Sequence, residues 1–263
     1  MPATIVPRLT ISILARNEAA HIERCLRSAA FADEVVVIDN ASQDNTVELA
    51  RACGAQVYVY ADWQGFAVQR NHQLRHAHGQ YLLLLDADEE ILPLLREEIL
   101  AAVGRGTEAV FGLQTLEIAF GKELTYAAPR KAGYRFFKRE LLQGFEGLVH
   151  EKPIFVKNVI YGGFFKNKVK HYSRTSVHGS LKKLAQYAML GAAKRSGAQK
   201  AGGVVRGLLS GGAAFVQTYI LKRGFTGGGA GFLFCLFIAL EAFFRYAALH
   251  YDQPKATERA ERS

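Results

Sequence analysis

Apolar runs and helix-spaced apolar positions alternate along the first hundred residues of the chain. The runs that predict buried strands are residues 9–14, 34–38, 56–60 and 80–85. Each run is followed by a polar turn and by a segment with apolar residues at helical spacing, as in residues 92–103. Strands that alternate with helices predict an α/β fold, in which a mostly parallel sheet has helices on both faces.

The pattern changes after residue 108. Strand-like segments then follow one another without helices between them, and they predict an antiparallel extension of the sheet. These segments are residues 109–120, 134–138, 149–155 and 168–172. Residues 180–251 have a helical pattern that glycine pairs and a glycine triplet interrupt. The chain is therefore expected to consist of three parts, residues 1–108, 109–178 and 179–263.

The composition is that of a globular protein with one α/β domain and an appendage. Of the 263 residues, 49% are hydrophobic and 22% are charged, which excludes disordered and low-complexity classes. The three cysteines are widely spaced and predict neither a disulfide framework nor a metal-binding CxxC pair. The N-terminal residues lack the charged segment and apolar run of a secretion signal. We therefore expect a cytoplasmic protein.

The positive charge is concentrated in the C-terminal part of the chain. The net charge is +9, yet residues 1–163 contain more acidic than basic side chains, whereas residues 164–263 contain 16 basic and 4 acidic ones. Such a region attracts phosphate-rich partners, either nucleic acid or an anionic membrane surface. No nucleic-acid-binding motif accompanies the charge. A membrane surface is therefore the expected partner.

The helical pattern of the C-terminal region supports that expectation. Its apolar and aromatic residues are interleaved with Arg206, Lys222 and Arg223, as in amphipathic helices that settle at anionic bilayers. The uncharged stretch 224–240 contains five glycines and is shorter than the roughly 20 apolar residues of a spanning helix. We expect the region to lie on a membrane rather than cross it. A helical cap on the α/β domain or a dimer interface is the alternative.

An acidic cluster directly follows the most apolar predicted strand. Asp86 and Asp88 end the run, and Glu89 and Glu90 come next. Carboxylates this close repel one another unless a cation lies among them. Mg²⁺ typically takes one or two protein carboxylates and leaves its other positions to water and phosphate oxygens. The cluster therefore predicts a divalent metal site, although an acidic helix start is the alternative.

A second polar cluster follows the strand 34–38. Asp39 ends that strand and can accept hydrogen bonds from a base or a ribose. Ser42, Asp44 and Thr46 are residue types that close turns and cap helices, and turn chemistry is the favoured interpretation for Asp44 and Thr46. Ligands of open α/β sheets bind at the carboxyl ends of the strands. We therefore expect Asp39 and Asp86 to lie at one site.

Three ordered motifs resemble the inverting glycosyltransferases of family two, whose fold is GT-A. They are the run Ile11-Ser-Ile-Leu-Ala-Arg16-Asn-Glu18, the Asp-x-x-Ser-x-Asp-x-Thr turn at 39–46, and Leu-Asp86-Ala-Asp88-Glu, a DxD motif. Further segments resemble the lipopolysaccharide core β-glucosyltransferase branch of that family, namely residues 23–28, 32–37, 62–66, 69–71 and 149–151. Asn40-Ala41 and Asn45 stand where that branch often has Ser-Gly and Gly.

The resemblance implies a role for each part of the chain. Residues 1–108 would form the nucleotide-sugar-binding half of a Rossmann-like GT-A fold, 109–178 the acceptor-binding and catalytic-base half, and 179–263 a helical membrane-associating region. It also implies nucleotide contacts by five residues: Arg16, Glu18, Asp39, Arg70 and Asp86. Asn71 would support a loop, and an exposed helix position is the alternative for Arg70.

The resemblance further implies the metal ligands. Asp88 would coordinate Mg²⁺ or Mn²⁺ directly, with Asp86 near the ribose and the metal. His171 lies where GT-A enzymes often supply another ligand from beyond the sheet, and neutral imidazole adds no charge to that site. A structural histidine is the alternative. The basic side chains around it could hold an anionic acceptor or form a solvated loop.

Inverting transfer requires a general base on the acceptor hydroxyl. Glu151, in Val-His-Glu within the acceptor half, is the first candidate, and His150 is the second. A surface glutamate paired with Lys152 is the alternative for Glu151. Metal ligands in the 86–90 cluster are poorer bases, because the metal withdraws charge from them.

The expected function is metal-dependent transfer of a hexose, with glucose implied by the branch, from a UDP-sugar to a lipopolysaccharide core acceptor at the cytoplasmic face of the inner membrane. A polyprenyl phosphate or another glycolipid is the alternative lipid-linked acceptor. A non-catalytic membrane-binding scaffold is the alternative from another class. A nicotinamide oxidoreductase is disfavoured, because Ala15-Arg-Asn-Glu18 contains no GxGxxG turn.

Overall fold

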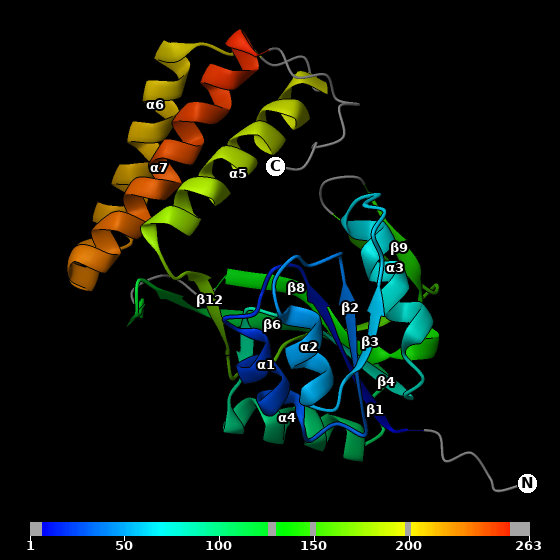
Figure 1. Ribbon diagram of the computed structural model, residues 1–263. Helices are drawn as coiled ribbons and strands as arrows, with labels where there is room; N and C mark the ends of the chain where they lie inside the picture. Colours follow the sequence, from blue (N-terminus) through cyan, green and yellow to red (C-terminus); the bar gives the residue numbers. More distant parts are fainter. Residues whose placement is uncertain (1–6, 126–129, 148–150, 198–200, 253–263) are drawn as a thin grey trace, which may run out of the picture. The chain divides into compact units, whose positions relative to one another are not determined.

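The computed structural model describes residues 7–125, 130–147, 151–197 and 201–252. The chain divides into two compact units (Figure 1). Unit 1 comprises residues 1–115 and 129–171, and unit 2 comprises residues 116–128 and 172–263. The three-part division by function remains a prediction.

Unit 1 is built on the parallel sheet that the sequence predicts. Its strand order is β3 (Gln56–Val59), β2 (Glu34–Asp39), β1 (Leu9–Ala15) and β4 (Tyr81–Asp86), and every adjacent pair is parallel. Because β1 lies in the centre, Ala15 is level with Asp39 on one side, and Leu14 is level with Asp86 on the other. The register therefore brings the two carboxylates to the same edge of the sheet.

The antiparallel extension of the sheet is confirmed in part, because residues 152–155 of the predicted segment 149–155 form a separate two-stranded sheet with residues 142–146. After β4 the order continues with β8 (Arg130–Lys138), β6 (Ala109–Ala119), β12 (Val169–Arg174) and β5 (Glu89–Ile91). Strand β8 is antiparallel to both β4 and β6. The remaining strands are β7 (Lys122–Glu123) and β11 (Ile160–Phe164), which pair with β6, and the hairpin of β9 (Leu142–Glu146) and β10 (Lys152–Phe155).

Strand β5 is a departure from the sequence prediction. Its residues directly follow Asp88 and have the composition of an acidic helix start, yet they pair antiparallel with β12. The pairing places Glu89 opposite His171. The acidic segment is thus held in extended form by a strand about eighty residues away in the sequence, which local propensity does not reveal.

Helices cover both faces of the sheet in unit 1 (Figure 1). One face carries α1 (Ile22–Ala29), α2 (Thr46–Ala52) and α4 (Pro93–Gly104), which share the larger buried core. The other face carries α3 (Phe66–His76), whose Ala67 packs with Leu82, Leu84 and Phe145. A single 3₁₀ turn, η1 (Arg139–Leu141), joins β8 to β9. The α/β arrangement is therefore the predicted one.

A buried hydrogen-bond cluster joins the strands at the opposite edge from Asp39 and Asp86. Glu34 accepts hydrogen bonds from the Thr10 hydroxyl and from the His78 backbone N–H, the latter at 2.8 Å. The Gly79 N–H donates to the same Thr10 hydroxyl at 2.8 Å. Gly79 is required there, because a Cβ atom would lie 2.6 Å from the Thr10 backbone nitrogen. The cluster fixes β1, β2 and the turn before β4 together.

Unit 2 contains a group of long helices. They are α5 (Val177–Gly197), α6 (Val204–Phe215), which continues as the π-helix η2 (Val216–Leu221), the 3₁₀ turn η3 (Gly224–Gly227) and α7 (Gly228–Tyr251). A Cβ atom at Gly207 or Gly211 of α6 would lie 2.9 Å from a backbone oxygen of α7. The two helices therefore approach closely, as helices with small residues four positions apart do in membranes.

The C-terminal helices are longer than the sequence analysis predicted. The helical segments Val204–Leu221 and Gly224–Tyr251 are long and apolar enough to cross a membrane. The glycines of the uncharged stretch form η3 and the start of α7, and α7 continues through Glu241 and Arg245. Glu241 is paired with Arg174. Both segments could also mediate association without crossing.

We expect Glu34→Gln to lower the free energy of unfolding by about 1–2 kcal/mol at neutral pH, because it removes a buried hydrogen-bonded carboxylate. Burial alone would raise the pKa of Glu34, but hydrogen bonds from Thr10 and His78 outweigh it and lower that pKa. The stabilisation is therefore present above the unfolded pKa and is lost as the pH falls through the lower folded pKa. Urea unfolding at neutral and acidic pH measures the difference.

Glu48→Gln is the matched control, because Glu48 is an exposed glutamate on α2. An equal loss of stability in both variants, or a loss in Glu34→Gln that grows with acidity, would contradict the assignment.

Candidate functional site

The loops after β1 and β2 are fastened to each other beside Asp39. The Asp39 carboxylate is fully buried and accepts hydrogen bonds from the Ser42 N–H at 2.8 Å and from the Ser42 hydroxyl. The Ser42 hydroxyl oxygen also accepts the Asn17 N–H at 2.8 Å. Asn17 has a positive φ of 54°, which asparagine tolerates better than most residues. Asp39 is thus held at the strand end by the turn that its own loop forms.

Asp44 and Thr46 make a second link between the two loops. Asp44 accepts the Ala19 N–H at 3.1 Å and the Thr46 N–H at 3.1 Å, and the Thr46 hydroxyl accepts the Glu18 N–H at 2.8 Å. Burial would raise the pKa of Asp44, but these hydrogen bonds lower it. The turn interpretation of the pair is confirmed, although α2 begins after Asn45 rather than at Asp44.

Arg16 and Glu18 lie in the loop that these links hold. Arg16 is exposed and Glu18 is half-buried. Both therefore stand at the carboxyl end of β1, between the loops that follow Asp39 and Asp86. Their contact with a nucleotide remains a prediction.

Asp86 is held between two arginines. The Arg70 Nη2 atom lies 2.7 Å from Asp86 Oδ1, and the Arg135 Nη2 atom lies 2.8 Å from Asp86 Oδ2. Arg70 comes from α3 and is only 4% exposed, so the exposed-helix alternative is wrong. Gln73 positions it, because Gln73 accepts from Arg70 at 2.9 Å and donates to the Ser12 carbonyl at 2.8 Å.

Asn71, the next residue of α3, supports the neighbouring hairpin. Its side-chain amide donates to the Phe145 carbonyl at 3.1 Å and accepts the Phe145 N–H at 2.8 Å. These two bonds fasten β9 to α3, as expected of a residue with a supporting role.

Sequence reasoning missed Arg135, which lies on β8. Besides Asp86, it contacts Glu89, with Arg135 Nη1 2.7 Å from Glu89 Oε2. The same Glu89 oxygen accepts the Asp86 N–H at 2.9 Å. The sequence predicts a strand over 134–138 but not that it flanks β4, so no local signal connects Arg135 to the acidic cluster.

The pKa values of Asp86 and Glu89 are shifted in opposite directions. Burial would raise the pKa of Asp86, but Arg135 and Arg70 hold it well below its usual range. Burial raises the pKa of Glu89, and the negative charge of Asp86 adds to this effect against the attraction of Arg135. Asp86 is therefore a firmly ionised group, and Glu89 is the carboxyl of the pair that takes up a proton first.

Asp88 and His171 form the part of the cluster that suits a metal ion. The His171 Nε2 atom lies 3.4 Å from Asp88 Oδ2. Adjacent ligands of an octahedral Mg²⁺ are about 3.0 Å apart, given bonds of about 2.1 Å, so a small shift lets one ion meet both atoms. Both Asp86 oxygens already face arginines. Among the described residues, no group of three or more His, Cys, Asp and Glu has metal-binding geometry, so substrate and water would supply the other ligands.

Glu151 lies at the same cluster. Its Oε1 atom is 3.5 Å from Arg70 Nε, so one guanidinium contacts both Glu151 and Asp86. The ion pair with the neighbouring Lys152 that the alternative required is not found among the described contacts. His150 lies outside the described residues. The structure thus brings together Arg70, Asp86, Asp88, Glu151 and His171 in unit 1.

The chain is similar to known glycosyltransferases. The sequence profile described as Glycosyl transferase family 2 matches residues 10–154. An uncharacterized glycosyltransferase of Rickettsia prowazekii is 27% identical over 92% of this chain and 86% of its own. The lipopolysaccharide core biosynthesis glycosyltransferase LpsC of Rhizobium meliloti is 32% identical over 37% of this chain and 40% of its own.

Among solved structures, one similar chain is the glucosyl-3-phosphoglycerate synthase of Mycobacterium tuberculosis, crystallised with Mn²⁺, uridine diphosphate and glucosyl-3-phosphoglycerate. The two chains are 21% identical with a TM-score of 0.41, and the match covers 52% of this chain and 58% of that one.

We expect Arg135→Ala to lower the free energy of unfolding by about 3 kcal/mol at neutral pH, because it leaves the buried Glu89 without a cation and Asp86 with Arg70 alone. Chemical denaturation measures the change. Arg139→Ala removes an exposed arginine from η1 and serves as the control. Similar stability of the two variants would show that Arg135 does not hold the cluster together.

Proposed function

Because the chain belongs to glycosyl transferase family 2, we propose that this glycosyltransferase moves a hexose from a UDP-sugar to a lipid-linked oligosaccharide with inversion. The observation that carries the proposal is the juxtaposition of the Asp88–His171 pair, the Arg70–Asp86–Arg135 cluster and Glu151 in unit 1. Such a site combines a place for a cation, charged groups for a diphosphate and a free carboxylate oxygen for proton transfer.

The donor nucleotide would bind at the carboxyl ends of β1, β2 and β4. Asp39 would accept hydrogen bonds from the uridine, while Arg16 and Glu18 border the same edge of the sheet. Arg70 would approach the diphosphate, because its guanidinium already contacts carboxylate oxygens with the spacing that phosphate oxygens also offer. The rule that ligands bind at this edge of open α/β sheets supports the placement.

Asp88 and His171 would hold Mg²⁺ or Mn²⁺. When bound, the ion supplies positive charge that stabilises the departing diphosphate. The charges of the cluster favour such a cation, because the two arginines already contact three carboxylates, those of Asp86, Glu89 and Glu151. The Asp88 carboxylate contacts His171 instead. Asp86 would join these ligands only if one of its oxygens left its arginine, because Arg70 and Arg135 contact both of them.

Glu151 would act as the general base. The acceptor hydroxyl oxygen attacks the anomeric carbon from the face opposite the diphosphate, the carbon–oxygen bond to the diphosphate breaks, and the hydroxyl proton passes to Glu151. No covalent sugar intermediate is needed. Arg70 would position the base, since it contacts the Glu151 carboxylate and the donor side of the site at the same time.

The acceptor is proposed to be a lipopolysaccharide core, with a polyprenyl phosphate or another glycolipid as the alternative. The similarity to the Rhizobium meliloti enzyme supports the first choice over part of the chain. The apolar helices of unit 2 support a lipid-linked acceptor of either kind. The reaction would then take place at the cytoplasmic face of the inner membrane.

We expect Asp88→Asn and His171→Gln each to lower turnover of UDP-glucose by about 10²-fold or more, because weakening metal binding removes several kcal/mol of charge stabilisation. Turnover is measured as the release of UDP in the presence of lipopolysaccharide core fragments and Mn²⁺. Asp252→Asn is the control, because Asp252 is an exposed carboxylate at the end of α7. Full activity of Asp88→Asn would refute the metal site, and absence of turnover with any UDP-hexose by the wild type would favour a non-catalytic scaffold.

We expect Glu151→Gln to reduce kcat by about 10²–10⁴-fold, the contribution typical of a general base, while UDP binding stays within about twofold. Single-turnover kinetics and calorimetric titration with UDP separate the two effects. Glu146→Gln, an exposed glutamate on β9, is the control. If Glu151→Gln turned over at the wild-type rate, the base would have to be another group.

A further inference from the structure

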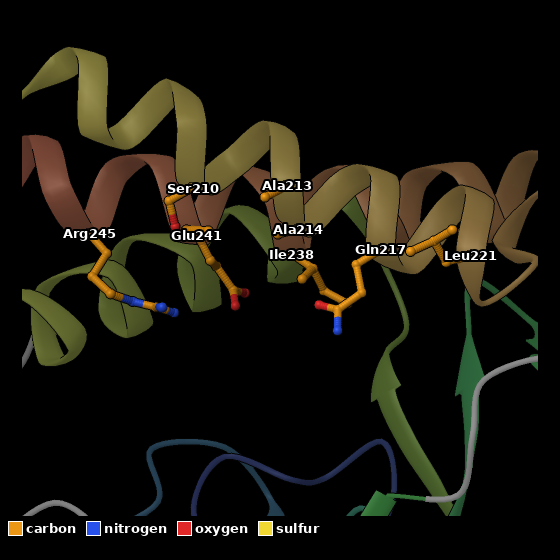
Figure 2. Close-up of a pocket in the computed structure, with 9 residues that line it drawn as sticks. Ser210, Ala213, Ala214, Gln217, Leu221, Ile238, Glu241 and Arg245 are labelled. Carbon is orange, nitrogen blue, oxygen red and sulfur yellow. The ribbon is translucent and has the colours of Figure 1, made fainter.

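The helices of unit 2 border an open groove of about 580 Å³ (Figure 2). Its walls come from α6, η2 and α7. Small and aliphatic side chains form one part of the lining, and polar groups form another. Ala213, Ala214 and Ile238 form the apolar middle of the lining. Glu241 and Arg245 lie at one end beside Ser210, and Gln217 lies at the other end beside Leu221 (Figure 2). The groove is therefore amphipathic along its length.

The charged side chains of the lining are Glu241 and Arg245. Glu241 is engaged by Arg174, whereas Arg245 makes no ion pair with a described residue. The Arg245 Nε atom is buried and has no hydrogen-bond partner in the described part of the chain. The Arg245 side chain as a whole is half-buried, and Glu241 is the carboxylate that acts on it. A buried nitrogen without a hydrogen-bond partner is costly, and an anion that accepted a hydrogen bond from this guanidinium would remove that cost.

A second arginine meets Arg245 at Gly191 of α5. Arg195 donates a hydrogen bond to the Gly191 carbonyl at 3.1 Å, and its guanidinium lies 5.1 Å from the ring centre of Tyr246. The Arg195 Nε atom is likewise buried without a partner among the described residues. Arg245 passes directly over Gly191, because a Cβ atom there would lie 2.5 Å from Arg245 Nε. The absence of a side chain at Gly191 thus sets the position of Arg245.

The outer side of the same helical segment is apolar and exposed. Its side chains recur at helical spacing, and Val205 is 73% exposed. The other members are Leu208, Leu209, Val216 and Ile220. Exposed apolar stripes of this kind settle into the boundary between lipid headgroups and acyl chains. The groove is therefore carried by a segment suited to lie among lipids.

We propose that this groove binds one anionic phospholipid, with the phosphate at Arg245 and Arg195 and the first part of an acyl chain along Ala213, Ala214 and Ile238. Arginine suits a phosphate because its planar guanidinium can donate two parallel hydrogen bonds. The apolar wall gives a lipid an advantage over free phosphate, which has nothing to bury there. This site is separate from the sugar-transfer site in unit 1 and does not depend on the proposed reaction.

The test uses a short-chain lipid that stays monomeric, because a bilayer would add a surface potential acting on every basic residue. Calorimetric titration of the full chain with dihexanoyl phosphatidylglycerol, below its micelle concentration, is expected to show one site per chain. Arg245→Gln is expected to weaken binding at least tenfold. Lys222→Gln removes the same charge at an exposed position outside the lining and should leave the affinity within about twofold.

Gly191→Ala gives an independent test at constant charge. Its methyl group would displace Arg245 without removing a cation, so we expect a several-fold weaker affinity with unchanged helix content by circular dichroism. Inorganic phosphate at equal concentration should not displace the lipid. Binding without saturation, equal losses in Arg245→Gln and Lys222→Gln, wild-type affinity in Gly191→Ala, or displacement by phosphate would each overturn the proposal.

Discussion

The arginine pair around Asp86 is the interaction on which the candidate site depends. Asp86, Glu89 and Glu151 each contact one or both of the guanidinium groups of Arg70 and Arg135. Without those cations, the repulsion between the carboxylates and the cost of burying them would push the three side chains apart. Arg70 comes from a helix and Arg135 from an antiparallel strand. The cluster therefore connects the parallel half of the sheet to its antiparallel extension.

The division of labour inside the acidic cluster follows from this arrangement. Asp86 offers its oxygens to arginines, whereas Asp88 turns toward His171. Two carboxylates only two residues apart thus acquire different surroundings, because β4 ends at Asp86 and the chain turns at Ala87 and Asp88. A cation and a diphosphate could then be bound through different residues of one short motif.

The parallel half of the fold could be predicted from the sequence because its information is local. Apolar runs mark β1, β2 and β4, and those of β2 and β4 end on Asp39 and Asp86, so the sequence alone predicts these two carboxylates at a common edge. Asp44 and Thr46 likewise act within their own turn. Patterns of this kind need only the spacing of neighbouring residues.

The remaining parts of the site depend on contacts between distant segments. Arg135 reaches Asp86 only because β8 pairs with β4, and Glu89 lies in a strand only because β12 pairs with it. His171 and Glu151 could be named from the family resemblance, but their distances to Asp88 and Arg70 could not. In unit 2, the position of Arg245 depends on a glycine about fifty residues earlier. None of these contacts can be predicted from the spacing of residues along the chain.

Strand β2 starts at Glu34 and finishes at Asp39, so one six-residue strand has a carboxylate of the structural hydrogen-bond cluster at its first position and a carboxylate of the candidate site at its last. The hydrogen bonds that hold the strands together and the loops proposed to bind the donor are thereby kept at opposite ends of the same strands. The loops at the Asp39 end can therefore change in evolution without disturbing the hydrogen bonds at the Glu34 end. A protein engineer could graft new loops onto the same strands for the same reason.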